Sequence, residues 1–414
     1  MRILYVTPYV PSRIRVRPFN LIKQLAKTHD IALVSLVADD YERELIKDIE
    51  PYCASVDLVE LPKWSAYARC LLALPTAMPL RVAYYRSPAF AQRIKEVVSR
   101  QKIDVAHGEL IKVVPVLKAA LEGEHIPMLF DSVDCISWYL RQTLDTAHNP
   151  IKKAFIYTEL LKMRRYERKA LADFERLVIS SPYDREQLGE LTGALHKIEV
   201  VSNSVDTDYF AASLEARMAN TLVFCAKLDY FPNAQAILHC CENILPLIWR
   251  ERPRTLLSIV GNNPPPVVRA LEIDGRITVT GYVPDIRPFL ATSAVALAPL
   301  LVAAGTQFKV LEALSMGTPM VTTPLCAAAL GTEDGVHLLA ADAEESQAFA
   351  DAVIRLLDDP AYAAQLGKAG QQFVTERYSW ASSAEVLKRF YEMIVRAPMQ
   401  QEAQALVAAR EINV

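Results

Sequence analysis

The chain has 414 residues, of which 52% are hydrophobic and 22% are charged, and its formal net charge is −3. This length and composition predict an ordinary globular protein of more than one domain and argue against intrinsic disorder. Nucleic-acid-binding domains usually carry a strong basic excess, so the net charge gives no case for nucleic acid as the main partner.

The first half of the chain alternates short buried strands with amphipathic helices. Parallel strands need crossover connections, and crossover helices cover both faces of a sheet, so this alternation predicts a doubly wound parallel sheet. The strands are expected at 2–7, 31–36, 56–61, 103–106, 128–130 and 177–180, and the helices at 17–27, 87–100, 109–122 and 150–173.

The net charge conceals two basic stretches in this half. The segment from Lys63 to Lys118 contains ten Lys or Arg and three acidic residues. The segment from Lys152 to Lys169 contains seven Lys or Arg and two acidic residues. Segment 64–87 also mixes Leu, Ala and aromatic residues with Arg and two prolines. These stretches are either solvated helix faces packed on the domain or a surface that holds the protein against an anionic membrane.

A domain boundary is predicted near 203–220, where KIEVVSNSVDTDYF passes from a strand into a polar turn. The α/β pattern then restarts, so we expect Rossmann-like domains at 1–202 and 203–380 facing a central cleft, and a C-terminal helix and tail at 381–414. The strands of the second domain are expected at 222–225, 256–260, 277–280, 294–298 and 320–323, and its helices at 233–249, 265–271, 285–291 and 306–316.

Residues 294–330 form a predicted β-α-β unit around which the second domain is organised. Gly305 or Thr306 stands at the expected N-cap of its helix. Backbone N–H groups at such a loop can approach an anion, so we expect a phosphate site. Lys309 suits the phosphate, and Glu312, three residues on, suits paired ribose hydroxyls. The alternative is a crossover helix with a surface ion pair.

Glycine is scarce, and nine of the 13 glycines lie from Gly261 onward. Gly261, Gly281 and Gly305 fall at the ends of predicted strands, and Gly317 falls at the C′ position of the helix in the β-α-β unit. Turns and close approaches of backbone to a ligand need glycine, so the second domain is expected to bind the nucleotide.

The seven cysteines show no CxxC or Cys/His ligand spacing, so they predict neither a disulfide framework nor a zinc site. They are typical of buried thiols in a reducing compartment. MRILYV passes directly into a predicted strand, and no apolar run reaches the roughly 18 residues that a spanning helix needs. We therefore expect no signal peptide, no transmembrane helix and a cytoplasmic location.

Several segments resemble the retaining GT-B glycosyltransferases, specifically glycosyltransferase family 4. GTQFKVLEALSMGTPMVTTP is similar to that family's nucleotide-sugar motif, VVSNSVDTDYF to its interdomain segment, and FCAKLDYFPNAQAI to the first strand and loop of its donor domain. LLSIVGNNPP and TGYVPDIRPFLATSAVALAPL resemble its next strands and turns, and ERYSW resembles the entry to its last helices, which cross back to the first domain. The resemblance is specific over about 176–385 and architectural before that.

The resemblance implies a donor site in the second domain. Glu312 would bind the donor ribose, and the backbone around Gly305, Thr306 and Gln307 would hold the diphosphate. Lys227 occupies the place of the basic residue that contacts the same diphosphate and stabilises its growing charge.

Four more residues complete this implied donor site. Lys309 would add to diphosphate binding, and Gly261 forms the turn after the second strand. Val283 and Asp285 fall in the segment that borders the nucleobase, through backbone more than side chain.

The sequence also departs from the family pattern. The first glutamate of the family's paired-glutamate motif, which contacts the transferred sugar, is replaced by Ala304. The glycine-rich turn after the first strand is replaced by a segment with Arg13, Arg15 and Arg17, and Ser204 stands where a glycine is usual. Either these arginines bind phosphate or an acidic acceptor, for which Arg15 and Arg17 are the candidates, or they face solvent.

Three further residues of the first domain are candidates for the acceptor side. His107 ends the predicted strand IDVAH and is expected to face the cleft, as a catalytic contact to sugar or acceptor or as a structural histidine. Asp131 and Asp134, in FDSVD, either bind acceptor hydroxyls or cap the following helix.

The resemblance implies a metal-independent, retaining transfer of a sugar, with no cofactor beyond the nucleotide-sugar donor. The acceptor would be a glycan or a lipid-linked glycan in polysaccharide or cell-envelope biosynthesis, reached from the cytoplasm or from the inner face of the membrane. The only Asp-x-Asp, 206–208, lies in the interdomain segment and is not interpreted as a metal pair.

Two other readings of the sequence remain. One is another GT-B enzyme, such as a nucleotide-sugar epimerase or a phosphorylase, for which no catalytic acid or cofactor lysine is marked. The other is a non-catalytic GT-B module that binds a glycan or a partner. Ala304 favours the module, whereas Glu312 and Lys227 argue against it.

Overall fold

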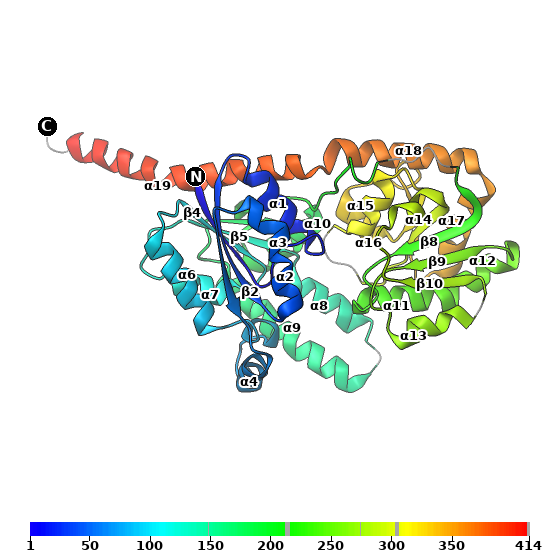
Figure 1. The fold of residues 1–414 in the computed structure, drawn as a ribbon, viewed down its shortest axis with the longest axis horizontal. Coiled ribbons are helices and arrows are strands. Elements are labelled where there is room, and N and C mark those ends of the chain that lie inside the picture. Colours follow the sequence, from blue (N-terminus) through cyan, green and yellow to red (C-terminus); the bar gives the residue numbers. More distant parts are fainter. Residues whose placement is uncertain (148, 212–215, 274, 303–305, 412–414) are drawn as a thin grey trace. The chain divides into compact units, whose positions relative to one another are not determined.

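The computed structural model describes residues 1–411 except 148, 212–215, 274 and 303–305, and side chains up to residue 396 apart from residue 273. The chain divides into two compact units (Figure 1). Unit 1 comprises Met1–Ser202 together with Trp380–Val414, and unit 2 comprises Asn203–Ser379.

Unit 1 is built on a seven-stranded parallel sheet of order β3-β2-β1-β4-β5-β6-β7. Its central strands are buried on both faces, which explains why they consist of continuous apolar runs instead of alternating patterns. The strands are β1 (Arg2–Thr7), β2 (Asp30–Val37), β3 (Ser55–Glu60), β4 (Val105–Glu109), β5 (Met128–Val133), β6 (Arg176–Ile179) and β7 (Ile198–Val200).

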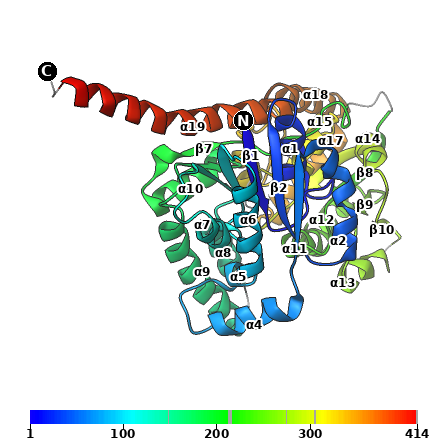
Figure 2. The same cartoon turned by 60° about the vertical axis from the view of Figure 1, so that its left-hand side comes forward.

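Helices cover both faces of this sheet (Figure 2). Leu4 and Val6 belong to a core that includes α6 and α7 side chains, and α1 lies beside α19, the C-terminal helix. The helices are α1 (Val16–Leu25), α2 (Asp40–Glu44), α3 (Ile46–Ile49), α4 (Lys63–Ala73), α5 (Leu80–Ala83), α6 (Pro88–Arg100), α7 (Val114–Ala120), α8 (Ile136–Asp145), α9 (Pro150–Ala170), α10 (Pro182–Thr192) and α19 (Trp380–Glu411), with 3₁₀ turns at Glu50–Tyr52 and Leu195–Lys197.

Unit 2 has a six-stranded parallel sheet of order β10-β9-β8-β11-β12-β13. Its strands are β8 (Met218–Cys225), β9 (Leu256–Val260), β10 (Ile277–Gly281), β11 (Ser293–Ala298), β12 (Met320–Thr322) and β13 (Leu339–Ala340). Its helices are α11 (Phe231–His239), α12 (Leu245–Glu251), α13 (Pro266–Arg269), α14 (Arg287–Thr292), α15 (Phe308–Ser315), α16 (Pro324–Leu330), α17 (Ser346–Asp358) and α18 (Pro360–Arg377), with a 3₁₀ turn at Ala270–Ile273.

The two parallel sheets confirm the predicted fold class, and most elements agree with the predicted ranges within a few residues. The expected helix at 233–249 is instead α11 and α12 joined by a π-helical turn, Cys240–Ile244. Pro246 at the start of α12 has no N–H to donate, which interrupts the i→i−4 hydrogen bonds there. The predicted helix at 109–122 starts only at Val114, because β4 continues to Glu109.

The C-terminal end of α15 confirms the prediction for Gly317. This residue has φ 64°, its N–H donates to Leu314 O at 2.9 Å, and Thr318 N–H donates to Ala313 O at 2.9 Å. These two bonds are those of a Schellman cap, which needs a left-handed residue and therefore favours glycine. Among the described residues, no helix is both long enough and apolar enough to cross a bilayer.

Candidate functional site

The strand order of unit 2 reverses at β8. The chain proceeds from β8 through β9 to β10 on one side, and from β11 through β12 to β13 on the other. Ligands of open parallel sheets bind outside the carboxyl ends of the strands at such a reversal. The carboxyl end of β8 leads to Lys227, and β11 is followed by the loop before α15.

The first turns of α15 carry a charged pair. Lys309 Nζ donates to Gln307 Oε1 at 3.1 Å, and Glu312 lies three residues further along the same helix face. Both side chains are half-buried. Burial raises the pKa of Glu312 to about 7, against the opposing effect of Lys309, and burial lowers the pKa of Lys309 to about 8.

The Glu312 carboxylate makes no hydrogen bond to any group in the described part of the chain. Burial, followed by the Glu312 carboxylate, raises the pKa of the Cys225 thiol at the end of β8. A carboxylate in this position has acceptor capacity for hydroxyl donors such as those of a ribose.

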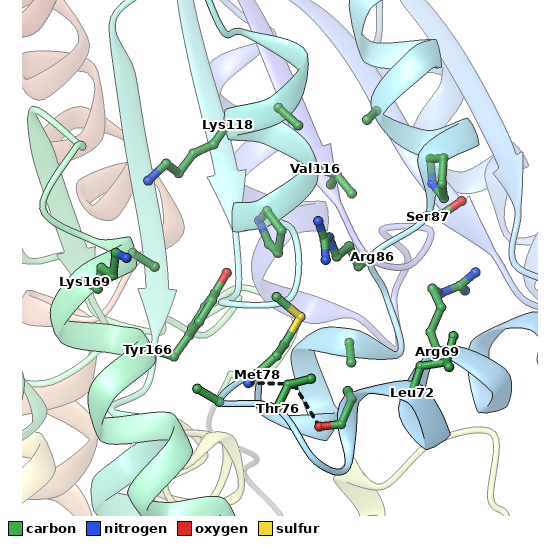
Figure 3. A pocket seen from close by; sticks show the side chains of 18 of the residues that line it. Arg69, Leu72, Thr76, Met78, Arg86, Ser87, Val116, Lys118, Tyr166 and Lys169 are labelled. Carbon is green, nitrogen blue, oxygen red and sulfur yellow. Dashed lines mark hydrogen bonds between the residues drawn. The ribbon is translucent and has the colours of Figure 1, made fainter.

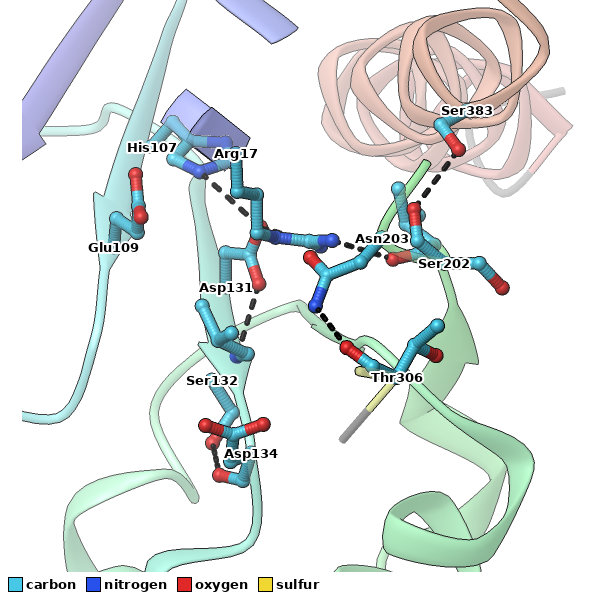
Figure 4. Close-up of polar contacts among 12 residues, drawn as sticks. Arg17, His107, Glu109, Asp131, Ser132, Asp134, Ser202, Asn203, Thr306 and Ser383 are labelled. Atoms are coloured by element: carbon cyan, nitrogen blue, oxygen red, sulfur yellow. Dashed lines mark hydrogen bonds and ion pairs between the residues drawn. The ribbon is translucent and has the colours of Figure 1, made fainter. Parts of the chain in front are cut away.

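The loop before α15 is anchored on its own unit. Thr306 is buried, and its main-chain oxygen accepts a hydrogen bond from Asn203 Nδ2 at 3.1 Å (Figure 4). The N-cap of α15 is Gln307, with φ −85° and ψ 114°, so the expected N-cap at Gly305 or Thr306 is corrected by one or two residues. Gly305 itself and Ala304 lie outside the described residues.

Lys227 lies in the loop after β8, and its side chain is exposed, with Nζ 3.7 Å from Asp229 Oδ1. Main-chain contacts fix this loop. Asn233 Nδ2 donates to Lys227 O at 2.8 Å, and Ala226 N donates to Val260 O at 2.9 Å. The Lys227 ammonium group is therefore exposed, while hydrogen bonds fix the backbone that carries it.

Gly261 follows β9 and lets the loop of Lys227 approach closely. A Cβ atom at this position would lie 1.7 Å from Ala226 O, far inside any real contact. A side chain therefore does not fit at this position, because two backbone segments approach each other closely here. The predicted approach of this turn to a ligand stays a prediction.

The segment after β10 holds the two residues expected beside the nucleobase. Val283 is half-buried against the core around α15, and Asp285 makes a bidentate ion pair with Arg287, of which the shortest distance is 2.7 Å. The Arg287 side chain and main-chain N–H hold the pKa of Asp285 below its usual value. The Asp285 carboxylate is therefore already engaged, which leaves the backbone of this segment for a ligand.

In unit 1 the strand order reverses between β1 and β4. Glu109 ends β4 and is buried, with Tyr5 Oη donating to it at 3.4 Å and Tyr9 Oη at 3.5 Å. Burial and the nearby Asp131 raise the pKa of Glu109 to about 8. Carboxyl groups with a raised pKa cluster at functional sites, and ligands of parallel sheets bind at strand reversals.

Two cations flank this carboxyl group. The Arg15 guanidinium lies 4.2 Å from the centre of the Tyr9 ring, and Lys112 Nζ lies 5.8 Å from the same ring and 4.6 Å from that of Tyr85. Burial, followed by Arg81 and Arg15, lowers the pKa of Lys112 to about 8. Of the two named acceptor-side candidates, Arg15 is exposed and Arg17 is buried.

Arg17 and Asp131 form a buried ion pair (Figure 4). Arg17 Nε donates to Asp131 Oδ2 at 2.9 Å, and Arg17 NH1 donates to Val201 O at 2.8 Å. Both side chains are almost fully enclosed. The expectations that Arg17 meets a ligand or solvent and that Asp131 binds acceptor hydroxyls are therefore corrected, because the two residues satisfy each other inside unit 1.

His107 is also enclosed, and it does not face an open cleft as expected. Its Nδ1 lies 2.6 Å from Tyr391 Oη of α19, and its ring stacks on that of Tyr5 at 4.1 Å between centres. Burial and Arg17 lower the pKa of His107 to about 3, so it is neutral at physiological pH. These contacts are those of a structural histidine, which was the alternative reading of the sequence.

Asp134 does not cap α8. The N-cap residue of that helix, Cys135, gives no side-chain cap, and the N–H groups of Ile136 and Ser137 donate to Glu167 of α9. The capping role proposed for Asp131 and Asp134 is thus filled by a residue that the sequence did not indicate. Asp134 is half-buried, and burial together with Asp184 raises its pKa to about 7.

Sequence reasoning missed Glu109 and Lys112. Because the strand was predicted to end at 106, attention rested on His107. In the structure β4 continues three residues beyond 106 and places Glu109 at its carboxyl end. Backbone conformation also marks the ends of these strands as a candidate site. Leu110, directly after β4, has φ 66°, and Val133, at the end of β5, has φ 61°. Left-handed values are unfavourable for both residues, and such conformations cluster at functional sites.

Within the described residues, no group of three or more His, Cys, Asp or Glu side chains is arranged to hold a metal ion. The carboxyl end of the unit 2 sheet carries two cations, Lys227 and Lys309, beside Asp229 and Glu312 and near the N-terminus of α15. This combination suits an anionic group such as a diphosphate.

Residues 219–359, which form most of unit 2, match the family model of the group 1 glycosyl transferases. This segment is therefore similar to the group 1 glycosyl transferases. The matched range contains Lys227, Gly261, Lys309 and Glu312.

A glycogen synthase from Mycobacterium tuberculosis is 26% identical over 242 residues, which cover 55% of this chain and 56% of that protein. The chain thus spans about half the length of the curated relatives that it matches.

Solved structures share the fold across nearly the whole chain. Sucrose-phosphate synthase of Thermosynechococcus elongatus superposes with a TM-score of 0.74 at 15% identity, covering 96% of this chain and 100% of that one. HepE of Anabaena, solved with UDP and glucose, gives a TM-score of 0.69 at 14% identity, covering 95% of this chain and 100% of that one. A glycosyltransferase of Rickettsia africae gives 0.70 at 14% identity, covering 96% of this chain and 99% of that one. These similarities confirm two Rossmann-like domains of the GT-B type.

Proposed function

We propose that the protein transfers a sugar, with retention, from a nucleotide-sugar donor to a glycan or lipid-linked acceptor, as a member of glycosyltransferase family 4. The observation that carries the donor site is the Glu312 carboxylate, which is half-buried beside Lys309 and has no hydrogen-bond partner among the described residues. Its place in the segment that is similar to the group 1 glycosyl transferases supports binding to the donor ribose.

The donor diphosphate would lie against the start of α15. Main-chain groups around Thr306 and Gln307 would hold it, with Lys309 and Lys227 as cations. The reaction breaks the bond between the sugar and the diphosphate, so negative charge grows on the departing oxygen. Cations and helix N–H groups stabilise that charge without a metal ion, which is the metal-independent mechanism we propose.

The acceptor would be bound by unit 1 at the reversal between β1 and β4. Glu109, Lys112 and Arg15 lie there around the Tyr9 ring, and Asp134 lies at the end of the neighbouring strand β5. Hydroxyl groups of a sugar acceptor fit a carboxyl group that accepts and aromatic rings that stack.

The test is binding of UDP, GDP, ADP and their glucose conjugates without added metal, measured by calorimetry and thermal shift. UDP comes first, because HepE was solved with it. A nucleotide at about 100-fold excess over its Kd should stabilise the folded protein by about 2.7 kcal/mol. Glu312→Ala should lose most of this stabilisation, whereas Glu344→Ala, an exposed glutamate of the same unit, should keep it.

Two results would contradict the proposal. If no nucleotide binds, the donor site is wrong and a non-catalytic glycan-binding module becomes the better reading. If a nucleotide binds equally to wild type and Glu312→Ala, the site lies elsewhere. Retention is tested separately, by the anomeric configuration of the product measured by NMR.

A further inference from the structure

Helix α4 of unit 1 presents an apolar stripe to solvent. Trp64, Tyr67, Leu71 and Leu72 follow helical spacing and are 77%, 64%, 68% and 74% exposed. A surface helix normally turns its apolar stripe inward and its charges outward. Here the reverse holds, since the inward positions of α4 are Ala66 and Ala73.

A cavity of about 1200 Å³ adjoins this helix (Figure 3). It is larger than most small-molecule pockets, which measure roughly 300–1,000 Å³. Leu72, Ala73 and Met78 line it from α4 and the turn that follows, and Val116 and Tyr166 line it from α7 and α9. The cavity therefore offers an apolar wall that is continuous with the exposed stripe through Leu72.

Cations surround the cavity, and none of the described residues that line it is Asp or Glu. The lining cations are Arg69, Arg86, Lys95, Lys118, Arg165 and Lys169.

Most of these cations are not neutralised within unit 1. Lys118 is paired with Asp173, but within the described parts of the chain Arg86, Lys95, Arg165 and Lys169 form no ion pair. Arg69 donates to Tyr84 O at 3.0 Å, and its Nε is buried without a partner among the described groups. A site with several uncompensated cations attracts an anion.

We propose that the apolar stripe of α4 and the basic cavity beside it bind an anionic phospholipid in a membrane surface. The stripe enters the acyl region of the leaflet, the phosphate meets the cations, and the upper part of an acyl chain lies along Leu72 and Met78. This assignment is independent of the proposed transfer reaction, because it uses none of the residues of the donor or acceptor sites.

The chemistry favours this occupant over two others. A free phosphate would use the cations but leave the stripe of α4 in water, where exposed apolar area is unfavourable. A protein partner would have to be acidic and apolar at once over a helix and a deep cavity. An anionic leaflet offers negative head groups to the cations and an apolar acyl region to the stripe. An amphipathic helix bearing Trp and Leu is a usual element that binds such a leaflet.

The experiment is co-sedimentation of the full chain with vesicles of phosphatidylcholine alone or with 30% phosphatidylglycerol. We expect binding to the anionic vesicles and a partition coefficient at least tenfold lower on the neutral ones, since each cation near the surface contributes about fivefold. Arg86→Gln/Lys169→Gln should lower binding about 30-fold. The charge-matched control Lys27→Gln/Lys47→Gln, on other elements of unit 1, should lower it little.

The apolar stripe is tested with a control of equal exposure. Tyr67 and Tyr41 are both 64% exposed, and Tyr41 lies on α2. Tyr67→Ser should reduce vesicle binding about tenfold, because it removes a buried ring from the leaflet, and Tyr41→Ser should not. Thermal unfolding without vesicles is measured for both variants as a stability control, because the Tyr67 ring contacts that of Tyr84 at 5.7 Å between centres.

Tryptophan emission gives a second readout. Trp64 is 77% exposed, whereas Trp380 is buried and Trp138 and Trp249 are half-buried. Anionic vesicles should shift the emission to shorter wavelength, and Trp64→Phe should abolish the shift while sedimentation persists.

The proposal would be overturned by equal binding to neutral and anionic vesicles, by no binding at all, or by an equal loss in Tyr41→Ser and Tyr67→Ser. Binding of inorganic phosphate to the cavity cations without any vesicle binding would assign the site to a soluble anion and reject the lipid.

Discussion

Lys309 and Glu312 lie one turn apart on α15, and the pKa of each is displaced by burial toward the neutral form. Among the described residues, Lys309 has one hydrogen-bond partner, Gln307 Oε1, and the Glu312 carboxylate has none. Under the proposed function, a bound nucleotide-sugar would supply an anion for Lys309 and hydroxyl donors for Glu312.

This relationship predicts a trade between stability and binding at Glu312. Its folded-state pKa of about 7 lies above its ordinary value, so the folded state binds more protons than the unfolded state between about pH 4.5 and 7. The unfolding free energy contributed by this group therefore falls as pH rises through that window. Glu312→Gln should melt at a higher temperature than wild type at pH 8 and at a similar temperature at pH 5, while it binds nucleotide more weakly. A lower melting temperature at pH 8 would show that the charge is well solvated.

A second prediction concerns the buried pair of Arg17 and Asp131. Removing one partner leaves an uncompensated charge inside the protein, so Arg17→Met should destabilise unit 1 by about 3–5 kcal/mol in urea unfolding. Arg17→Met/Asp131→Leu should recover most of that loss, because no charge is then buried.

The matched control for this pair is the ion pair of Arg43 and Glu60, whose side chains are 47% and 76% exposed. Arg43→Met should cost less than about 1 kcal/mol. Equal effects of Arg17→Met and Arg43→Met would mean that Arg17 is solvated, in conflict with its contacts.

The third prediction follows from His107. Its folded-state pKa of about 3 lies below its ordinary value of 6.5, so the unfolded state binds the extra proton between these values. Stability should therefore fall as pH drops from 6.5, by up to about 1.4 kcal/mol per pH unit from this group. His107→Asn should reduce that acid slope, measured by urea unfolding between pH 4 and 7. His125→Asn, at an exposed loop position, should keep it.

The fourth prediction tests the close approach at Gly261. Because a Cβ there would overlap Ala226 O, Gly261→Ala must displace the loop that carries Lys227. We expect weaker nucleotide binding, by about tenfold or more, and a lower melting temperature. Gly275→Ala should have little effect, since nothing lies within 4 Å of its Cβ position. Unchanged binding in Gly261→Ala would remove Lys227 from the donor site.

Much of unit 2 could be predicted from sequence because its signals are local. The Gly317 cap, the apolar face of α15 and the spacing of Lys309 and Glu312 depend on neighbours within one helix. The π-helical turn before Pro246 was missed because an apolar pattern does not show how the hydrogen bonds of a helix shift ahead of a proline.

Unit 1 was predicted less well because its side chains are paired over long distances. Arg17 and Asp131 are 114 residues apart, and His107 and Tyr391 are 284 apart, so neither sequence position shows that a partner removes the charge or the exposure. A strand end was also misplaced, and this shifted attention from Glu109 to His107. From the local sequence, Arg17, Asp131 and His107 were therefore expected to be free to bind a ligand, whereas each contacts a residue distant in sequence.

The return of α19 to unit 1 has a consequence for how the protein is made. Tyr391, fully buried against His107, is synthesised about 190 residues after the last strand of the unit 1 sheet. At the usual rate of translation this interval lasts about 10–40 s, during which the whole of unit 2 emerges and can fold. Throughout that time the surface beneath α19, including His107 and Tyr5, has no cover. Unit 1 is thus the first to begin folding on the ribosome and the last to finish, and ribosome-bound chains that stop short of Tyr391 should be the most readily digested by protease within unit 1.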